Sequence, residues 1–345
     1  MTVFMDYRPK LPQCWQDKFR WLGKSPCRDN TGAENGGDMG SAAAIEIDRV
    51  ILNFSPTSLQ VLNLVLAVVM FSIALELKPQ DFKRLFQAPK SLLTGLFSQF
   101  LLLPFLTFCL VLVTQPQPSI ALGLMLVASC PGGNISNFIT HRAKGNSALS
   151  VSLTAFSTVA AIVLTPANIA FWGSLYGPTR EILRQTSIDP MSVAITVGMM
   201  LVLPLCLGML LNVKRPEITA RLRTPLQYLS MGIFIAFVVL ALAANWQLFL
   251  QYATAVAALV FMHNALALGG GYAVATLAGL SSFDRRSITI ETGIQNSGLG
   301  LILIFGFFDG LGGMAVVAAF WGMWHIISGI SLAGLMARRP LPQPG

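Results

Sequence analysis

The sequence predicts an all-α polytopic membrane protein. Hydrophobic residues make up 54 % of its 345 positions and charged residues only 11 %, whereas soluble domains carry about 25 % charged residues. Apolar spans recur along the chain, each close to the roughly 20 residues that cross a bilayer. We therefore expect a multi-pass protein of the cell membrane whose helices face lipid.

The chain divides into a polar tail and a transmembrane domain. Residues 1–48 contain no long apolar run, and we expect this tail to be flexible. Residues 49–340 form the transmembrane domain. Its nine predicted spans have the approximate limits 58–77, 91–113, 119–140, 147–173, 190–212, 226–244, 250–279, 287–308 and 313–336.

Basic residues predict the orientation of these spans. They follow the first, third, fifth, seventh and ninth spans, whereas the opposite loops hold only Arg180 and Arg184. Positive residues stay on the cytoplasmic side, so the N-terminus is predicted outside and the C-terminus inside. The same rule explains the net charge of +8 without a nucleic-acid partner.

Glu291 is the one acidic residue placed well inside an apolar span. A carboxylate at membrane depth costs about 2.5–3.5 kcal/mol and indicates a functional site. On a continuous helix it would share a face with Thr292, Gln295 and Asn296. Glycines interrupt the same segment and favour a broken helix around a cation. A purely structural carboxylate, tied to a partner on another helix, is the alternative.

The third span contains a second interruption. Pro131, Gly132 and Gly133 cannot continue a regular helix, and the freed backbone groups need protein or water partners. Asn134, Ser136 and Asn137 lie beside them. A structural kink remains possible, but three polar side chains at a break favour a binding site.

The fourth span carries a stripe of polar residues. The second span contains another polar side chain at membrane depth, Gln99. The stripe consists of Ser147, Ser150, Thr154, Ser157 and Thr158. The stripe follows helical spacing and predicts either close helix packing or hydroxyl ligands.

The third and eighth spans run in opposite directions across the membrane, as in transporters with inverted repeats. We expect repeats over about 55–173 and 190–336.

Three stretches resemble the bile acid:sodium symporter family. They are SCPGGNISN (129–137), KGNSALSVSLTAFST (144–158) and ETGIQNSGL (291–299). The resemblance covers about residues 55–336. It implies a panel domain and a core domain, with two broken helices that cross in the core. It also implies secondary active transport, in which an organic anion crosses with sodium by alternating access.

The resemblance further implies two coupled sodium ions that are not tightly bound. The anion, a bile acid, steroid conjugate or small carboxylate, would lie near Asn134 and Asn296. The first sodium site would comprise Ser136, Asn137, Ser150, Thr154 and Glu291. The second would comprise Gln99, Glu291 and Gln295, with the backbone carbonyls of Thr292 and Ile294.

Other functions remain as alternatives. A proton-coupled carrier or a channel could also use Glu291. An intramembrane enzyme would need paired carboxylates, a Ser/His dyad or a metal cluster, and no such pattern is present, so we predict no enzyme activity. A receptor or structural protein would not need polar residues at two helix breaks. The oligomeric state is not indicated by the sequence.

Overall fold

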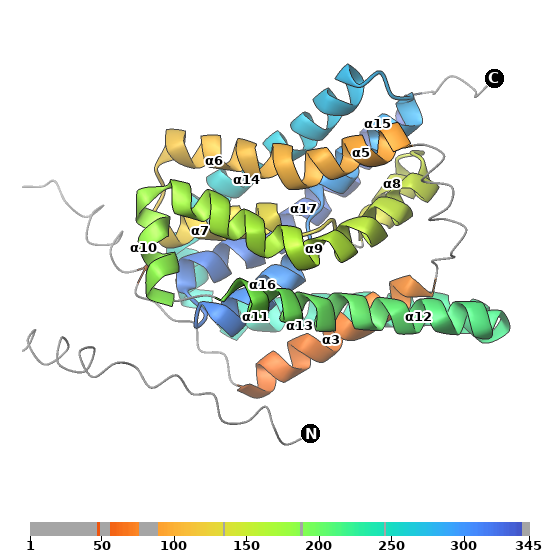
Figure 1. Cartoon of the computed structure of the whole chain (residues 1–345), viewed down its shortest axis with the longest axis horizontal. Coiled ribbons are helices and arrows are strands. Elements are labelled where there is room, and N and C mark those ends of the chain that lie inside the picture. Colours follow the sequence, from red (N-terminus) through yellow and green to blue (C-terminus); the bar gives the residue numbers. More distant parts are fainter. Residues whose placement is uncertain are drawn as a thin grey trace, which may run out of the picture. The chain divides into compact units, whose positions relative to one another are not determined.

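The computed structural model describes residues 47–48, 56–75, 89–133, 135–186, 189–244 and 246–339. The chain divides into two units, 1–41 and 42–345, and all described residues belong to the second. The predicted tail thus lies almost entirely outside the described residues. The described part is helical, and no strand occurs in it (Figure 1).

The helices overlap the predicted spans, although α13 begins ten residues before the predicted sixth span. The order along the chain is α3 (Pro56–Ala74), α5 (Pro89–Phe97), η2 (Ser98–Leu102), α6 (Leu103–Thr114), α7 (Pro118–Ser129), α8 (Ile135–Arg142), α9 (Ser147–Leu175), α10 (Gly177–Thr186), α11 (Pro190–Val197), η3 (Gly198–Val202), α12 (Leu203–Lys214), α13 (Pro216–Ala244), α14 (Trp246–Leu277), α15 (Ser282–Gly293), α16 (Ser297–Phe307) and α17 (Gly312–Arg338).

Within the described residues, five helical stretches are long and apolar enough to cross a membrane. They coincide with the second, fourth, fifth, seventh and ninth predicted spans, and α3 and α13 coincide with the first and sixth. Large hydrophobic side chains such as Val113 and Leu277 are 83 % and 87 % exposed. Such exposure suits a lipid surface better than water. The five stretches are Pro89–Thr114, Ser147–Leu175, Met191–Lys214, Val256–Leu277 and Gly312–Arg338.

The third and eighth predicted spans are each divided into two helices. In the third span, α7 ends at Ser129 and α8 begins at Ile135. In the eighth, α15 ends at Gly293 and α16 begins at Ser297. The predicted interruptions are therefore confirmed, and their four helix ends lie inside the protein rather than at its surface.

The second and fifth spans each contain one wide π-helical turn, η2 and η3. Both turns end immediately before a Leu-Pro pair that contains Pro104 or Pro204. Proline lacks an N–H and its ring crowds the carbonyl four residues earlier, so a wider turn relieves the conflict. The first of these turns carries the side chain of Gln99, which is 1 % exposed.

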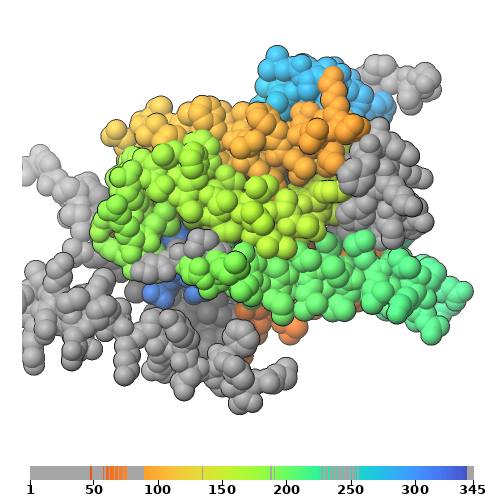
Figure 2. Space-filling model, in the orientation of Figure 1, coloured from red at the N-terminus to blue at the C-terminus, as the bar shows by residue number. Residues whose placement is uncertain are grey.

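The segment between the fourth and fifth spans is a short helix, α10, and not the predicted loop. Pro178 suits its first turn, and the Thr179 hydroxyl donates to the carbonyl of Gly173 over 2.6 Å. This helix packs against α7 and α9. Figure 2 shows the yellow-green surface of α9 and α10 between the orange surface of α5 and α6 and the green surface of α12.

Helix α7 lies at the centre of the described unit. Its residues from Ser119 to Ser129 are all buried, and it contacts α6, α9 and α17. A helix that is apolar on all sides must be enclosed by protein or lipid. Because α7 leads directly into the first helix break, the packing around it fixes the position of that break.

Candidate ion site at the two helix breaks

The two breaks bind each other through their backbones. The Gly133 N–H donates to the Ile294 carbonyl over 2.6 Å, and the Asn296 N–H donates to the Pro131 carbonyl over 2.9 Å. Gly132 and Gln295 form an antiparallel bridge between these two bonds. Each break thus supplies hydrogen-bond partners that the other lost when its helix ended.

Glycine is required where the breaks approach most closely. A Cβ atom on Gly132 would collide with Glu291 Oε1. A Cβ atom on Gly133 would lie 2.6 Å from the carbonyl oxygen of Gln295, which is a backbone atom that cannot swing away. The Gly-Gly pair therefore interrupts the helix and also makes room for the opposite segment.

Three hydroxyl groups surround the carboxylate of Glu291, which is 2 % exposed. Ser136 and Ser150 donate to Oε2 over 2.6 and 3.1 Å, and Thr154 donates to Oε1 over 2.7 Å. No Lys, Arg or His of the described chain pairs with this carboxylate. Its partners come from α8 and α9, so three helices converge on one acidic group.

Asn137 completes this group. Its Oδ1 atom lies 2.9 Å from the Ser150 hydroxyl oxygen and 3.2 Å from the Thr154 hydroxyl oxygen. The structure thus brings together all five residues predicted for the first sodium site. Carboxylate, hydroxyl and amide oxygens are the ligands that a hard cation such as sodium prefers. Within the described residues, no group of three or more His, Cys, Asp or Glu side chains could hold a metal ion.

A second polar group lies on the other side of the breaks. Gln99 Nε2 donates to Gln295 Oε1 over 2.6 Å and to the Cys130 carbonyl over 3.0 Å. Gln295 Nε2 donates to the Thr292 carbonyl over 2.8 Å. The residues predicted for the second site therefore lie together. However, the Glu291 side chain makes its hydrogen bonds with the first group, and the Ile294 carbonyl already accepts from Gly133.

The expectation that Glu291 shares a helix face with Gln295 and Asn296 is wrong. Because α15 ends at Gly293, Gln295 and Asn296 lie in the break and not on the helix that carries Glu291. Asn296 instead caps α16, where its Oδ1 accepts from the Leu299 N–H over 3.0 Å. Its Nδ2 is buried and has no partner among the described residues. Asn134, the other predicted substrate residue, lies outside the described residues.

Three supporting hydrogen bonds were not predicted. The Ser98 and Thr292 hydroxyls are 2.7 Å apart and connect η2 to α15. Asn264 Nδ2 donates to the Gly293 carbonyl over 2.8 Å, and the Ser328 hydroxyl donates to Asn264 Oδ1 over 2.6 Å. The only sequence signal for Asn264 is an amide within an apolar span, and this does not identify its partner.

Sequence comparison places these features within a known family. The Sodium Bile acid symporter family profile matches residues 63–252. The uncharacterized sodium-dependent transporter YocS of Bacillus subtilis is 31 % identical over 294 residues, which cover 84 % of this chain and 88 % of the relative.

Plant and animal relatives extend the similarity. The probable sodium/metabolite cotransporter BASS1 of rice, a chloroplastic protein, is 30 % identical over 80 % of this chain and 65 % of its own length. The human ileal sodium/bile acid cotransporter is 27 % identical over 69 % of this chain and 67 % of its own length. This chain therefore belongs to the sodium bile acid symporter family of sodium-dependent membrane transporters.

Proposed function

We propose that this protein is a secondary active transporter that moves an organic anion together with sodium by alternating access. The observation that carries this proposal is the Glu291 carboxylate, buried against hydroxyl groups where two broken helices meet. The rice and human relatives, which are named as a sodium/metabolite cotransporter and a sodium/bile acid cotransporter, support this proposal.

The first sodium ion would bind between Glu291, Asn137 and the three hydroxyls of Ser136, Ser150 and Thr154. A hydroxyl has one hydrogen and two lone pairs, so it can donate to the carboxylate while it offers a lone pair to the ion. One carboxylate among neutral oxygens balances one monovalent charge.

The second sodium ion would bind at Gln99 and Gln295, with the carbonyls of Thr292 and Ile294 and the Glu291 carboxylate. Gln99 Oε1 supports this assignment, because it is a buried acceptor without a partner among the described residues. The carbonyls belong to a broken helix, where the oxygens are free to adopt directions that a regular helix forbids.

The anion would bind beside the breaks, near Asn134 and Asn296. Helices α8 and α16 begin at the crossing, and helix N-termini attract negative charge. The unpaired Nδ2 of Asn296 supplies a buried donor at the same place. Sodium binding would offset the charge of Glu291 and join α8, α9 and α15, and so complete the anion site.

The predicted inverted repeats and the panel and core domains give this site a route to both sides of the membrane. Sodium and the anion would stabilise one arrangement of the core, which then moves against the panel. If two sodium ions accompany one monoanion, one net positive charge crosses, worth about 2.3 kcal/mol per 100 mV. A negative interior would therefore drive accumulation.

Uptake into proteoliposomes tests the proposal. A panel of labelled bile acids, steroid sulfates and small carboxylates is presented with external sodium or with potassium in its place. We expect uptake of at least one anion in sodium only. Glu291→Gln should abolish this uptake although the protein still inserts, whereas Glu217→Gln, which alters an exposed carboxylate on α13, should not.

Two results would contradict this mechanism. Uptake that continues in potassium and follows a pH gradient would favour proton coupling. Glu291→Gln protein with unaltered sodium dependence would remove Glu291 from the ion site.

A further inference from the structure

A separate cavity of about 470 Å³ lies far from the two breaks, among α9, α10, α11 and α16. Ile169 of α9 lines it, and Ile169 is 15 residues, or about 22 Å of helix, beyond Thr154. Phe307 of α16 lines it from a helix that starts at the breaks. The cavity is therefore a different site from the proposed ion and anion sites.

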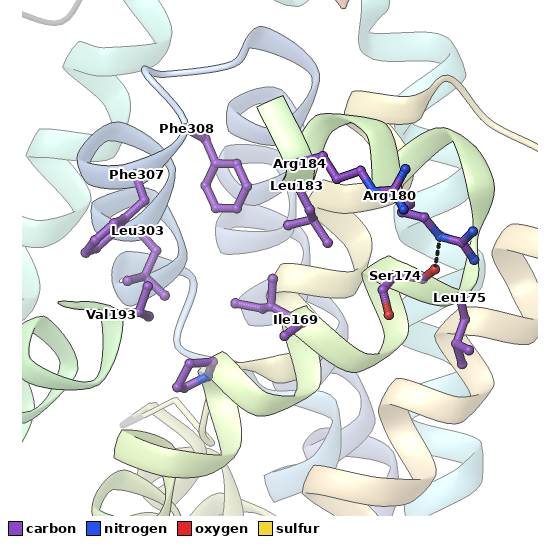
Figure 3. Close-up of a pocket in the computed structure, with 12 residues that line it drawn as sticks. Ile169, Ser174, Leu175, Arg180, Leu183, Arg184, Val193, Leu303, Phe307 and Phe308 are labelled. Atoms are coloured by element: carbon purple, nitrogen blue, oxygen red, sulfur yellow. Dashed lines mark hydrogen bonds between the residues drawn. The ribbon is translucent and has the colours of Figure 1, made fainter. Parts of the chain in front are cut away.

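The walls of this cavity are mainly apolar, but one side is cationic. Figure 3 shows Val193, Leu303 and Phe307 on one side and Arg180 and Arg184 on the opposite side. A volume of this size lies within the range of small-molecule sites, which combine an apolar lining with a few polar groups that orient the ligand. A small carboxylate would leave most of the apolar wall without contact.

The position of the two arginines is unusual for this chain. In the sequence they are the only basic residues in the short loops on the predicted outer side. They lie four residues apart on α10, so they share one face of that helix, and both line the cavity. The rule that keeps positive residues inside gives no reason for this pair. Arg184 has an interaction of its own within the protein, so the expectation of a negatively charged ligand depends mainly on Arg180.

Arg180 is held so that it can still bind a ligand. Its Nε–H donates to the carbonyl oxygen of Ser174 over 2.6 Å, which fixes the plane of the guanidinium (Figure 3). Its two terminal amino groups make no hydrogen bond with any described residue. A planar guanidinium with free N–H groups is well suited to a carboxylate, sulfate or sulfonate.

We propose that this cavity binds an amphipathic organic anion from the outer solution. The apolar body of the ligand packs against Leu303 and Phe307, and its single anionic group pairs with Arg180 and Arg184. Such a site would concentrate the solute before it reaches the crossing. This inference extends the proposed anion transport, but binding here depends on neither sodium nor Glu291.

Calorimetric titration of the full chain in phosphatidylcholine nanodiscs tests the proposal. The probe is naphthalene-2-sulfonate, and all titrations use potassium buffer. We expect saturable binding, at least tenfold weaker binding of the neutral naphthalene-2-sulfonamide, and no displacement by inorganic sulfate. The Glu291→Gln protein should bind the probe like the wild type. Its failure to do so would place the probe at the crossing and overturn the inference while leaving the transport proposal intact.

Substitutions locate the bound probe. Arg180→Gln with Arg184→Gln should weaken binding at least tenfold, and replacement of both by Lys should restore most of it. Arg221→Gln with Arg223→Gln removes the same charge from exposed positions of α13 and should change affinity less than twofold. Unchanged affinity in the first pair, or displacement of the probe by phosphatidylglycerol added to the discs, would overturn the assignment to a solute.

Discussion

The Gly133 N–H donates to the Ile294 carbonyl, and these residues belong to two helix breaks 161 positions apart in the chain. The breaks are joined in a short antiparallel contact. It consists of this bond, the bond from the Asn296 N–H to the Pro131 carbonyl, and the bridge between Gly132 and Gln295. Side chains from both breaks then lie within reach of one another. The ion site proposed around Glu291 depends on this contact.

The hydroxyl of Thr154 is expected to contribute directly to sodium affinity. Thr154→Val keeps the side-chain shape but removes a donor to a carboxylate, an interaction worth about 1.5–3 kcal/mol. The apparent sodium affinity of uptake should fall about 10–100-fold. Thr158→Val is the matched control, since among the described residues the Thr158 hydroxyl bonds only the Thr154 carbonyl of its own helix. Equal effects of both substitutions would contradict a ligand role for Thr154.

Gly132→Ala should abolish sodium-dependent uptake. The added Cβ would collide with Glu291 Oε1 and push the carboxylate away from the hydroxyls of Ser136, Ser150 and Thr154. Gly306→Ala is the control, because a Cβ there meets nothing within 4 Å and alanine favours a helix by about 0.5–1 kcal/mol. Uptake and the amount of inserted protein are measured for both. A Gly132→Ala protein with normal uptake would show that the two breaks are not closely packed during transport.

Asn264→Leu should destabilise the second break. It removes the donor to the Gly293 carbonyl and leaves a buried backbone acceptor unpaired, at a cost of about 1–3 kcal/mol. The midpoint temperature of thermal unfolding in detergent should fall. The increase in this temperature that sodium causes should become smaller. Thr276→Val, an exposed change on the same helix α14, should stay within about 0.5 kcal/mol of wild type. If the sodium-induced rise is intact in Asn264→Leu, the asparagine has no influence on the ion site.

Gln99→Leu tests the number of sodium ions. It removes the amide that bonds Gln295 and the Cys130 carbonyl, so the second ion would lose a ligand while the first site keeps its residues. The Hill coefficient for sodium, which cannot exceed the number of coupled sites, should fall from between 1 and 2 to about 1. Sodium and solute fluxes measured together provide the stoichiometry. An unchanged flux ratio would exclude a second ion at Gln99.

The sequence was sufficient to predict both breaks, because proline and adjacent glycines act locally on the backbone. The residues around Glu291 are implied by the family resemblance, whereas the polar stripe that includes Ser150 and Thr154 leaves close helix packing as an alternative. The structure places these groups in contact. Their role in sodium binding is still a prediction.

Other features could not be predicted because they depend on distant parts of the chain. Asn264 is 29 residues from Gly293, and Ser98 is 194 residues from Thr292. Neither separation follows from helical periodicity. The sequence predicts a loop where the short helix α10 lies, because its polar residues show no membrane pattern. The shared face expected for Glu291 and Gln295 failed because the helix ends between them.

The main-chain bridge between the breaks has a consequence for how such a protein changes over time. Every amino acid carries the N–H or C=O groups that form this joint, apart from the missing proline N–H. Apart from Gly132 and Gly133, where a Cβ would collide with the opposite break, neighbouring side chains can therefore be exchanged during evolution without dismantling it. A scaffold joined in this way is free to acquire new cargo by altering a few surrounding residues.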